Sequence, residues 1–432
     1  MSFTRRQFLG SSAAAVIVAG TMAKGKVFGA NEKIGMGVIG FRGRGGSHIG
    51  AWTSNPRTEL VALCDVDKSV LDKGVATVST KTKKKPKGYV DLRKLLDNKS
   101  VDAVSIATPN HWHSLAAVWA CEAGKDVYVE KPCSHNVWEG RQLVNAARKY
   151  GRIVQHGTQI RSSVGMQEAM QKLRDGVIGE VYMARGLCYK SRDSIGKKAD
   201  CPVPKGVDYN LWLGPAPEHA FNPNRFHYNW HYCYDYGNGD MGNQGVHQMD
   251  IARWGLGVAL PKKVTAMAGM YIFDDDKEVP NVSTAMFSYP DAGKKGRMLV
   301  FETRPWYTND EDGAKIGVLF YGSEGYMVID SYSAYRTFLG EKKEPGPSND
   351  KGGDHYGNFL DAIQARDPKI LNAEVLEGHY SAALCHLGLL SFRIGRSFDF
   401  DPEKEQILND AEADAYLTRK YRVPFVVPKI DV

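Results

Sequence analysis

The sequence has few cysteines, and they show none of the spacing typical of a metal site. Its seven cysteines include no CxxC pair and no other close spacing. Structural zinc is usually held by closely spaced cysteine and histidine pairs, so we expect no metal in this protein. Because the number is odd, at least one thiol must be free. The chain also has no internal repeat.

A long hydrophobic run is also missing, so the sequence predicts no stable membrane span. The apolar stretch at residues 8–20 is short and rich in alanine and glycine. It follows Thr4-Arg5-Arg6-Gln7-Phe8-Leu9, which is a twin-arginine export pattern. We therefore expect residues 1–30 to be a signal peptide cleaved near Ala30, and the protein to be periplasmic or otherwise exported. The alternative is an uncleaved tail that is flexible or tethers the protein to the membrane.

Basic residues are not accompanied by the aromatic residues that nucleic-acid binding favours. The net charge is +7, and lysines are concentrated at residues 81–87. Without interleaved aromatics this run indicates a solvated loop, and we expect no nucleic-acid partner. The remaining composition, 43% apolar and 24% charged, is that of a soluble globular protein.

A glycine-rich turn follows the first apolar segment after the signal. Residues 33–40 predict a strand, residues 47–55 predict a helix, and the turn between them is Gly40-Phe41-Arg42-Gly43-Arg44-Gly45. Strand, turn and helix in this order are the context of a dinucleotide-binding fingerprint, because glycines let the backbone approach a pyrophosphate at the helix N-terminus. The match is imperfect, since Arg42 occupies the place of the middle glycine.

An acidic residue ends the second predicted strand. Asp65 follows the apolar residues 59–64 and lies 20 residues after Gly45. A carboxylate at this position accepts hydrogen bonds from the adenosine ribose and repels a 2′-phosphate, which favours NAD over NADP. Arg42 and Arg44 are near enough in sequence to offset that repulsion. The alternative role for Asp65 is that of a helix N-cap.

Strands and helices alternate through the rest of the first 155 residues. Helices are predicted at 91–98, after residue 113 and at 138–150, and strands at 103–107, 126–129 and 153–156. This alternation predicts right-handed βαβ units and a doubly wound parallel sheet. Lys131 directly follows the strand at 126–129, so it projects from the carboxyl edge of the sheet, where ligands bind in such folds. Pro132 restricts the backbone of Lys131 and holds the ammonium in place.

The second half of the sequence changes pattern. Strands are predicted at 181–187, 263–271, 282–289, 296–303, 317–321 and 325–330, with no helix between most of them, which favours an antiparallel sheet. Before this sheet, Gln159 and Arg161 are polar residues placed to face the cleft. An aromatic insertion at residues 188–257 separates the first two strands and contains Trp230. Its aromatic rings suit the C–H faces of a pyranose, but they equally suit a satellite core under a long loop.

Together, these elements resemble the Gfo/Idh/MocA oxidoreductases, which are sugar and cyclitol dehydrogenases. The resemblance rests on the glycine turn, Asp65, the TPNHWH loop at 108–113 and Glu130-Lys131-Pro132. It implies a Rossmann domain at 31–155, an α+β domain at 156–400 whose late helices pack back on the first domain, and a C-terminal tail at 401–432. In the family the α+β domain has a large open, mainly antiparallel sheet that forms the usual oligomer interface, so the resemblance also implies a homo-oligomer, a dimer or a tetramer. The resemblance also implies that Lys131 bonds a substrate hydroxyl near the nicotinamide, and that the cofactor is lined by Thr108, Pro109, Asn110, His113 and Glu130.

A helix predicted at residues 239–254 carries the remaining candidate catalytic residues. Asn243 and His247 are four residues apart and so share one helical face. The family has an aspartate and a histidine at these positions, and the histidine is the acid/base. Asn243 can orient the imidazole and the substrate, but an amide cannot raise the proton affinity of the imidazole as a carboxylate does. Asp240 and Asp250 are the candidates to compensate.

The sequence therefore predicts an NAD-dependent oxidoreductase acting on a hydroxyl or ketone of a sugar, glycoside or cyclitol. Lys131, His247 and Asn243 are the catalytic candidates, and Gln159, Arg161 and Trp230 join them in binding substrate. One alternative is an NAD-dependent glycosidase that oxidises a sugar transiently, eliminates the aglycone and recycles the cofactor in place. Another is a non-catalytic sugar-binding relative, which the asparagine at 243 suggests.

Overall fold

The protein is described by a computed structural model that covers Gly29, residues 32–330 and residues 332–432. The predicted signal at 1–30 lies outside these residues, apart from Gly29. Within the part that is described, no helix combines the length and the apolar character that crossing a bilayer requires.

The first domain is built on a six-stranded parallel sheet, as the sequence predicts. Its order is β3-β2-β1-β4-β5-β6. Successive strands are added toward one edge from β1 to β3 and toward the other edge from β4 to β6, so the order reverses between β1 and β4. Ligands bind at such a switch point in open α/β sheets. The strands are β1 (Ile34–Ile39), β2 (Thr58–Cys64), β3 (Lys87–Tyr89), β4 (Ala103–Ile106), β5 (Asp126–Val129) and β6 (Val154–His156).

Helices cover both faces of this sheet because its strands are apolar on both sides. Val127 and Val129 of β5 belong to a core with α4 (Leu92–Leu96), α5 (Asn110–Glu122) and α6 (Val137–Lys149). Tyr128, between them, points into a second core with Trp52 and Phe359. That core lies under α2 (Arg44–Ser54), α3 (Lys68–Thr82) and α11 (His355–Ala365).

The second domain is a ten-stranded mixed sheet in which all neighbours are antiparallel except β7 and β10. Its order is β14-β13-β12-β11-β7-β10-β9-β8-β15-β16. The strands are β7 (Val181–Cys188), β8 (Lys263–Gly269), β9 (Val282–Tyr289), β10 (Arg297–Thr303), β11 (Ile316–Gly322), β12 (Gly325–Ile329), β13 (Tyr335–Leu339), β14 (Glu344–Asn349), β15 (Phe398–Asp401) and β16 (Gln406–Ile407). The predicted fold class, a Rossmann domain followed by an α+β domain with a mainly antiparallel sheet, is confirmed.

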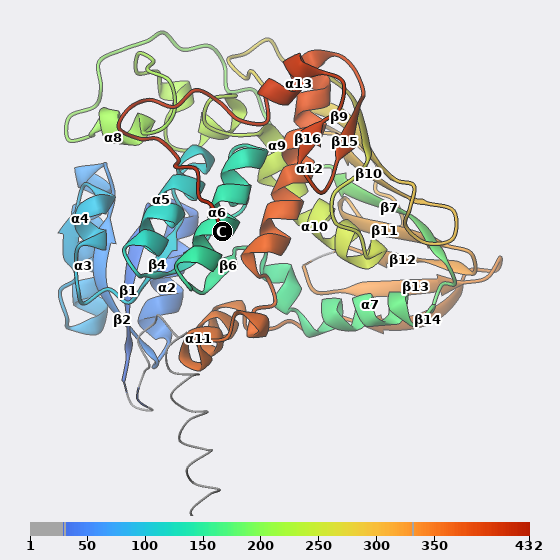
Figure 1. The fold of residues 1–432 in the computed structure, drawn as a ribbon, viewed down its shortest axis with the longest axis horizontal. Helices are drawn as coiled ribbons and strands as arrows, with labels where there is room; N and C mark the ends of the chain where they lie inside the picture. Colours follow the sequence, from blue (N-terminus) through green and yellow to red (C-terminus); the bar gives the residue numbers. More distant parts are fainter. Residues whose placement is uncertain (1–28, 30–31, 331) are drawn as a thin grey trace, which may run out of the picture.

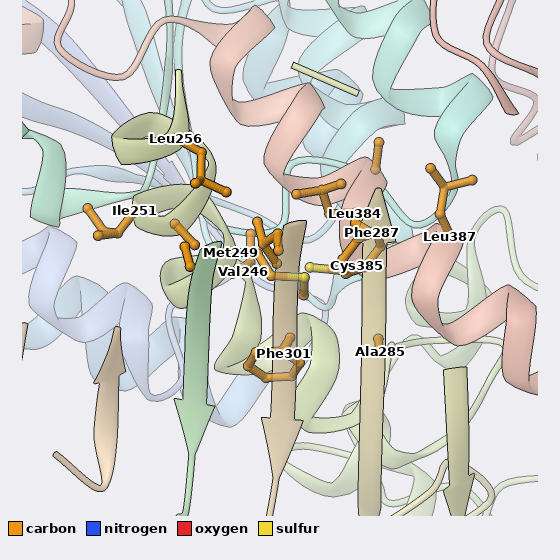
Figure 2. Close-up of a cluster of buried hydrophobic side chains, with 14 of the residues drawn as sticks. Val246, Met249, Ile251, Leu256, Ala285, Phe287, Phe301, Leu384, Cys385 and Leu387 are labelled. Atoms are coloured by element: carbon orange, nitrogen blue, oxygen red, sulfur yellow. The ribbon is translucent and has the colours of Figure 1, made fainter. Parts of the chain in front are cut away.

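One face of the large sheet carries the main core of the second domain. Figure 2 shows Val246 and Met249 of α10 (Gly245–Leu256) beside Phe301 of the sheet and Leu384 of α12 (Val375–Ile394). α10 approaches the sheet closely because Gly245 has no side chain; a Cβ there would lie 2.4 Å from the Phe301 ring. α7 (Val164–Arg174) packs beside α10 on the same face.

The two domains are joined by late helices and by the C-terminal residues. α12 lies between the sheets and packs against α6 on one side and α10 on the other (Figure 1). Phe425, Val427 and Ile430 are buried in the core of α5 and α6. Residues 401–432 are predicted to be a C-terminal tail, and these apolar side chains fix the end of that tail to the Rossmann domain. Short elements complete the fold: α8 (Tyr209–Leu213), α9 (Gly239–Asn243), α13 (Ala411–Ala415) and the 3₁₀ turns η1 (Gln159–Ser162), η2 (Pro223–Arg225), η3 (Asn229–Tyr232) and η4 (Pro368–Ile370).

Candidate active site

A cavity of about 420 Å³ lies at the carboxyl edge of the parallel sheet. The Rossmann domain lines it with the glycine turn, Asp65, the loop at 108–110, His113 and Glu130-Lys131. The aromatic insertion provides the opposite wall, which includes Trp212, Phe226, Tyr228 and Trp230. Asn243 contributes to the lining beside Lys131. Most residues predicted to bind a cofactor therefore surround one space.

The geometry of the glycine turn fits a dinucleotide despite the imperfect motif. At Gly45 a Cβ would lie 2.2 Å from the Gly40 carbonyl oxygen, so only glycine permits this tight approach. Gly43 has a φ of 63° and, among the described atoms, a Cβ there would have no neighbour within 4 Å. Gly43 thus supplies the backbone freedom that Arg42 cannot. α2 begins directly after it without a side-chain cap, which leaves its first N–H groups available to an anion.

Asp65 is part of the cavity wall and does not cap a helix. Its carboxylate accepts hydrogen bonds from the backbone N–H groups of Phe41 (3.2 Å) and Asp67 (3.0 Å). The N-cap of α3 is Asp67, which bonds the N–H groups of Ser69 and Val70. Burial raises the pKa of Asp65 to about 6. Further hydrogen bonds donated by a ligand would therefore stabilise the charged form of this carboxylate.

Glu130 and His113 hold the wall of the cavity in place through hydrogen bonds. Glu130 accepts hydrogen bonds from Arg44 (2.9 Å), His48 (3.0 Å) and Gln159 (3.2 Å). Burial raises its pKa, but the hydrogen bond with His48 and the charges of Arg44 and Lys131 outweigh burial and hold the pKa well below its usual range. His113 lies between the carbonyl oxygens of Thr108 (2.8 Å) and Pro132 (2.6 Å), and so ties the two loops together.

Lys131 reaches from the end of β5 to the second domain. Its ammonium donates hydrogen bonds to the Asn243 backbone oxygen (2.5 Å) and to the Asn243 side-chain oxygen (3.3 Å). Burial lowers its pKa from the usual lysine value. The helix predicted at 239–254 is in fact broken at Gln244, between α9 and α10. This break leaves the Asn243 carbonyl free to accept the ammonium.

His247 lies on the first turn of α10, close to Lys131. Its side chain is buried, and its Nδ1 has no hydrogen-bond partner among the described residues. Burial, aided by the Lys131 charge, lowers the pKa of His247 to about 3. The imidazole is therefore neutral at ordinary pH and has a lone pair available to accept a proton.

Neither aspartate near His247 replaces the carboxylate that the sequence lacks. Asp240 is paired with Arg192, and Asp250 with Arg161 at 2.8 Å. Asn243 does not take over either, because its side-chain oxygen faces Lys131. Instead, the ring of Tyr332 packs edge-on against the imidazole, with 5.4 Å between the ring centroids.

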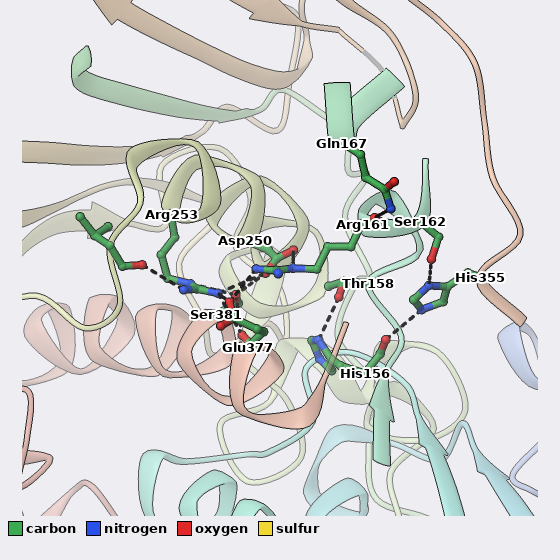
Figure 3. Close-up of polar contacts among 11 residues, drawn as sticks. His156, Thr158, Arg161, Ser162, Gln167, Asp250, Arg253, His355, Glu377 and Ser381 are labelled. Atoms are coloured by element: carbon green, nitrogen blue, oxygen red, sulfur yellow. Dashed lines mark hydrogen bonds and ion pairs between the residues drawn. The ribbon is translucent and has the colours of Figure 1, made fainter. Parts of the chain in front are cut away.

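The structure does not bring Arg161 into the cavity, contrary to expectation. Its guanidinium is buried and binds Asp250 and Glu377, next to Arg253 and Ser381 (Figure 3). Burial raises the pKa of Asp250, but the Arg161 charge outweighs burial and lowers it. Arg161 therefore fastens η1 to α10 and α12. Gln159 also lies behind the cavity wall, bonded to Tyr128 and Glu130.

We expect Arg161→Met to destabilise the protein strongly. The change would leave the buried Asp250 carboxylate without its closest cation, and breaking such a pair costs about 3–5 kcal/mol. Urea denaturation followed by circular dichroism measures this loss. Lys68→Met, which breaks an exposed pair with Asp72, should change stability by less than about 1 kcal/mol. Equal effects of the two substitutions would contradict a structural role for the buried pair.

The aromatic insertion forms a small core of its own and also lines the cavity. Trp212, Phe221, Phe226 and Tyr236 form a small core of their own. Tyr228 is 60% exposed and faces the cavity with Trp230. The backbone of the insertion is bonded to the first residue of α3 (Lys68 N–H to Gly206 oxygen, 3.0 Å), and its Leu211 oxygen accepts the Trp112 indole N–H at 3.0 Å. The wall over the cavity is therefore fastened to the Rossmann domain.

Comparison with known proteins agrees with this architecture. Among curated relatives, the chain is similar to glycosyl hydrolase family 109 protein 1 of Shewanella sp. (strain MR-4), with 33% identity over 158 residues, 35% of this chain and 34% of that protein. It is also similar to a glycosyl hydrolase family 109 protein of Saccharopolyspora erythraea, with 31% identity over 174 residues, 39% of this chain and 37% of that protein. These matches thus span only about a third of the relatives.

Solved structures share the fold over most of the chain. The WlbA dehydrogenase from Bordetella pertussis, in complex with NADH and UDP-GlcNAcA, has a TM-score of 0.63 and 19% identity, covering 86% of this chain and 99% of that chain. Levoglucosan dehydrogenase, in complex with NADH and levoglucosan, has a TM-score of 0.64 and 17% identity, covering 85% and 99%.

Family models match both domains. Residues 34–158 match the NAD-binding Rossmann fold of the Gfo/Idh/MocA oxidoreductases, and residues 181–300 and 324–427 match the C-terminal α/β domain of the same family. The chain therefore belongs to the Gfo/Idh/MocA oxidoreductase family, and its first domain is the family's NAD-binding domain.

Proposed function

We propose that this protein is an NAD-dependent oxidoreductase that acts on a hydroxyl or ketone of a sugar, glycoside or cyclitol. The observation that carries the proposal is the meeting of Lys131 and Asn243, which line the cavity, with His247, which is buried close to Lys131. The ammonium lines the same cavity as the glycine turn and Asp65, and the neutral imidazole near it comes from the other domain. This is the pair of groups that oxidation of a carbinol requires.

Some residues of the site would bind the cofactor, and others would act on the substrate. The glycine turn and the start of α2 would hold the pyrophosphate, Asp65 the adenosine ribose, and Thr108, Pro109 and Asn110 the nicotinamide side. When bound, NAD supplies the hydride acceptor. His247 accepts the hydroxyl proton on its neutral imidazole. Lys131 donates a charged hydrogen bond to the substrate oxygen as negative charge develops on it, which lowers the barrier.

A substrate panel tests the proposal directly. The purified protein is incubated with NAD⁺ and with monosaccharides, methyl glycosides, p-nitrophenyl glycosides and inositols, while nicotinamide absorbance and product are followed. We expect reduced nicotinamide and a ketosugar to appear together. If no sugar gave a nicotinamide signal in single-turnover mixtures, a binding protein without catalysis would be the better description.

A glycosidase is the second candidate, and one comparison favours it. The curated relatives that the chain resembles are named as glycosyl hydrolase family 109 proteins. In such a reaction the sugar is oxidised, loses its aglycone, adds water and is reduced again, so the nicotinamide returns to its starting state. The fastened wall over the cavity suits a cofactor that stays in place. Release of p-nitrophenol without net nicotinamide reduction would support this candidate over the dehydrogenase.

We expect Asp65→Ala to weaken the binding of NADH by about tenfold or more, since charged hydrogen bonds contribute about 1.5–3 kcal/mol. Binding of NADPH should weaken much less, because the substitution also removes the repulsion of a 2′-phosphate. Fluorescence titration with each nucleotide measures both effects. Glu59→Gln is the control. Glu59 lies on β2, the strand before Asp65, and its carboxylate pairs with Lys84. This substitution should change neither affinity. If Asp65→Ala discriminated between NADH and NADPH as strongly as the wild type does, the ribose would have to bind elsewhere.

Export and self-association are further parts of the proposal. The twin-arginine pattern at Arg5-Arg6 supports export, and retention of an Arg5→Lys, Arg6→Lys variant in the cytoplasm would be the expected result of cell fractionation. One face of the large sheet exposes Met267, Met286 and Met298 on the neighbouring strands β8, β9 and β10, which supports a homo-oligomer. A monomeric mass by light scattering would contradict this.

A further inference from the structure

Tyr332 is the aromatic residue in contact with the candidate base, and nothing so far assigns it a function. It lies between β12 and β13, far in sequence from both the Rossmann domain and α10. Its ring meets the His247 imidazole edge-on, at an interplanar angle of 82°. The side chain is not a core residue, since Tyr332 is 47% exposed while His247 is 5% exposed. One side of the ring therefore covers His247 and the other remains open.

The hydroxyl of Tyr332 is anchored so that its own proton is free. The side-chain N–H of Gln244 donates a hydrogen bond to the phenolic oxygen at 2.9 Å, and the same amide also contacts Gln248 at 3.3 Å. An amide N–H can only donate, so the phenol accepts in this bond. Among the residues that the structure describes, no acceptor takes the phenolic proton. The hydroxyl is thus a fixed donor without a partner.

Gln244 also places this donor next to the other two candidate groups. It is the residue between α9 and α10, directly after Asn243, which binds the Lys131 ammonium, and three residues before His247. The ammonium, the imidazole and the phenol are therefore assembled around one helix junction. A sugar carbinol held by Lys131 and His247 has oxygen substituents on its neighbouring carbon atoms, and these need a donor.

We propose that Tyr332 is a substrate-binding residue: its hydroxyl donates a hydrogen bond to an oxygen on the carbon next to the reacting carbinol, and its ring holds His247 in position. The inference rests on the proposed function and adds to it a residue that contacts the substrate next to the reacting carbon. The site selects polyols and sugars with a vicinal oxygen over simple secondary alcohols.

Two substitutions separate the hydroxyl from the ring. Tyr332→Phe removes only the donor, Tyr332→Leu removes the ring as well, and Tyr182→Phe is the control at an exposed tyrosine of β7. Each variant is assayed with the panel sugar that the wild-type protein turns over fastest, and with the analogue of that sugar that lacks the vicinal hydroxyl. Saturation-transfer NMR with methyl β-D-glucopyranoside measures binding without turnover.

For Tyr332→Phe we expect KM to rise by about three- to tenfold, the effect of one lost neutral hydrogen bond, with kcat and its pH profile unchanged. The deoxy analogue should raise the wild-type KM by a similar factor but add nothing in Tyr332→Phe. Tyr332→Leu should also lower kcat, by about two- to tenfold, because the imidazole loses its aromatic neighbour. Tyr182→Phe should behave as wild type.

The outcomes distinguish this inference from the proposed function. If the wild type turns over a sugar and Tyr332→Phe has an unchanged KM or loses only kcat, the hydroxyl contact is overturned and the proposed function stands. Sugar binding that weakens in Tyr332→Phe, in a protein that oxidises no panel sugar, would support the contact and contradict the oxidoreductase. A wild-type protein that neither binds nor oxidises any panel sugar would overturn both.

Discussion

Lys131→Ala is expected to lower kcat by about a hundred- to a thousandfold, the usual cost of removing a donor that stabilises developing negative charge. The ammonium is buried at the end of β5 and already faces the opposite domain through Asn243. A substrate oxygen bound there would exchange one of those contacts for its own. Alanine leaves the space and removes both the charge and the donor.

Steady-state kinetics with the fastest panel sugar measure this loss, and titration with NADH shows whether the cofactor site survives. Lys262→Ala is the matched control, because its ammonium pairs with Asp291 on the surface of the other domain. Lys131→Arg keeps the charge but not the compact shape, and we expect it to recover only part of the activity. If Lys131→Ala folded normally and kept a near-normal kcat, Lys131 would have no role in the reaction.

For His247→Asn we expect kcat to fall by about a hundred- to ten-thousandfold, the range attributed to a general base. Asparagine is polar and of similar size, so the buried position should remain filled, but an amide cannot accept a proton. His219→Asn is the control, because this half-buried histidine pairs with Asp235 and does not line the cavity. If both variants retained wild-type kcat, the base would have to be another group.

The pH dependence offers a second test of the same residue. Because burial lowers the pKa of His247 to about 3, falling pH should not protonate it in the range where an ordinary histidine, with a value of 6.5, gains its charge. We therefore expect kcat/KM to keep its value from neutral pH down to about pH 5. On the alkaline side Lys131 should lose its charge below the usual lysine pKa, since burial lowers that value, and activity should decline there. An acid limb centred near 6.5 in the wild type, absent from His247→Asn, would contradict the assignment of a strongly lowered pKa.

The sequence by itself determined the Rossmann domain and one side of the site. Strand, glycine turn and helix are local patterns; Asp65 follows directly on β2, and Lys131 lies two residues after the end of β5. The carboxyl ends of such strands meet at one edge of the sheet, so the position of these residues in the chain was enough to place them together. The alternation from βαβ units to consecutive strands likewise predicted the second sheet.

Only the tertiary structure decided which polar groups remain free to act. Arg161 and Asp250 are 89 residues apart, and Arg161 and Glu377 are 216 apart, so no local pattern shows that these charges neutralise one another away from the cavity. The same holds for Lys131 and Asn243, which are 112 residues apart, and for Gln244 and Tyr332, which are 88 apart. The energy of a buried charge or donor depends on its partners, and in this protein the partners come from packing one domain against the other.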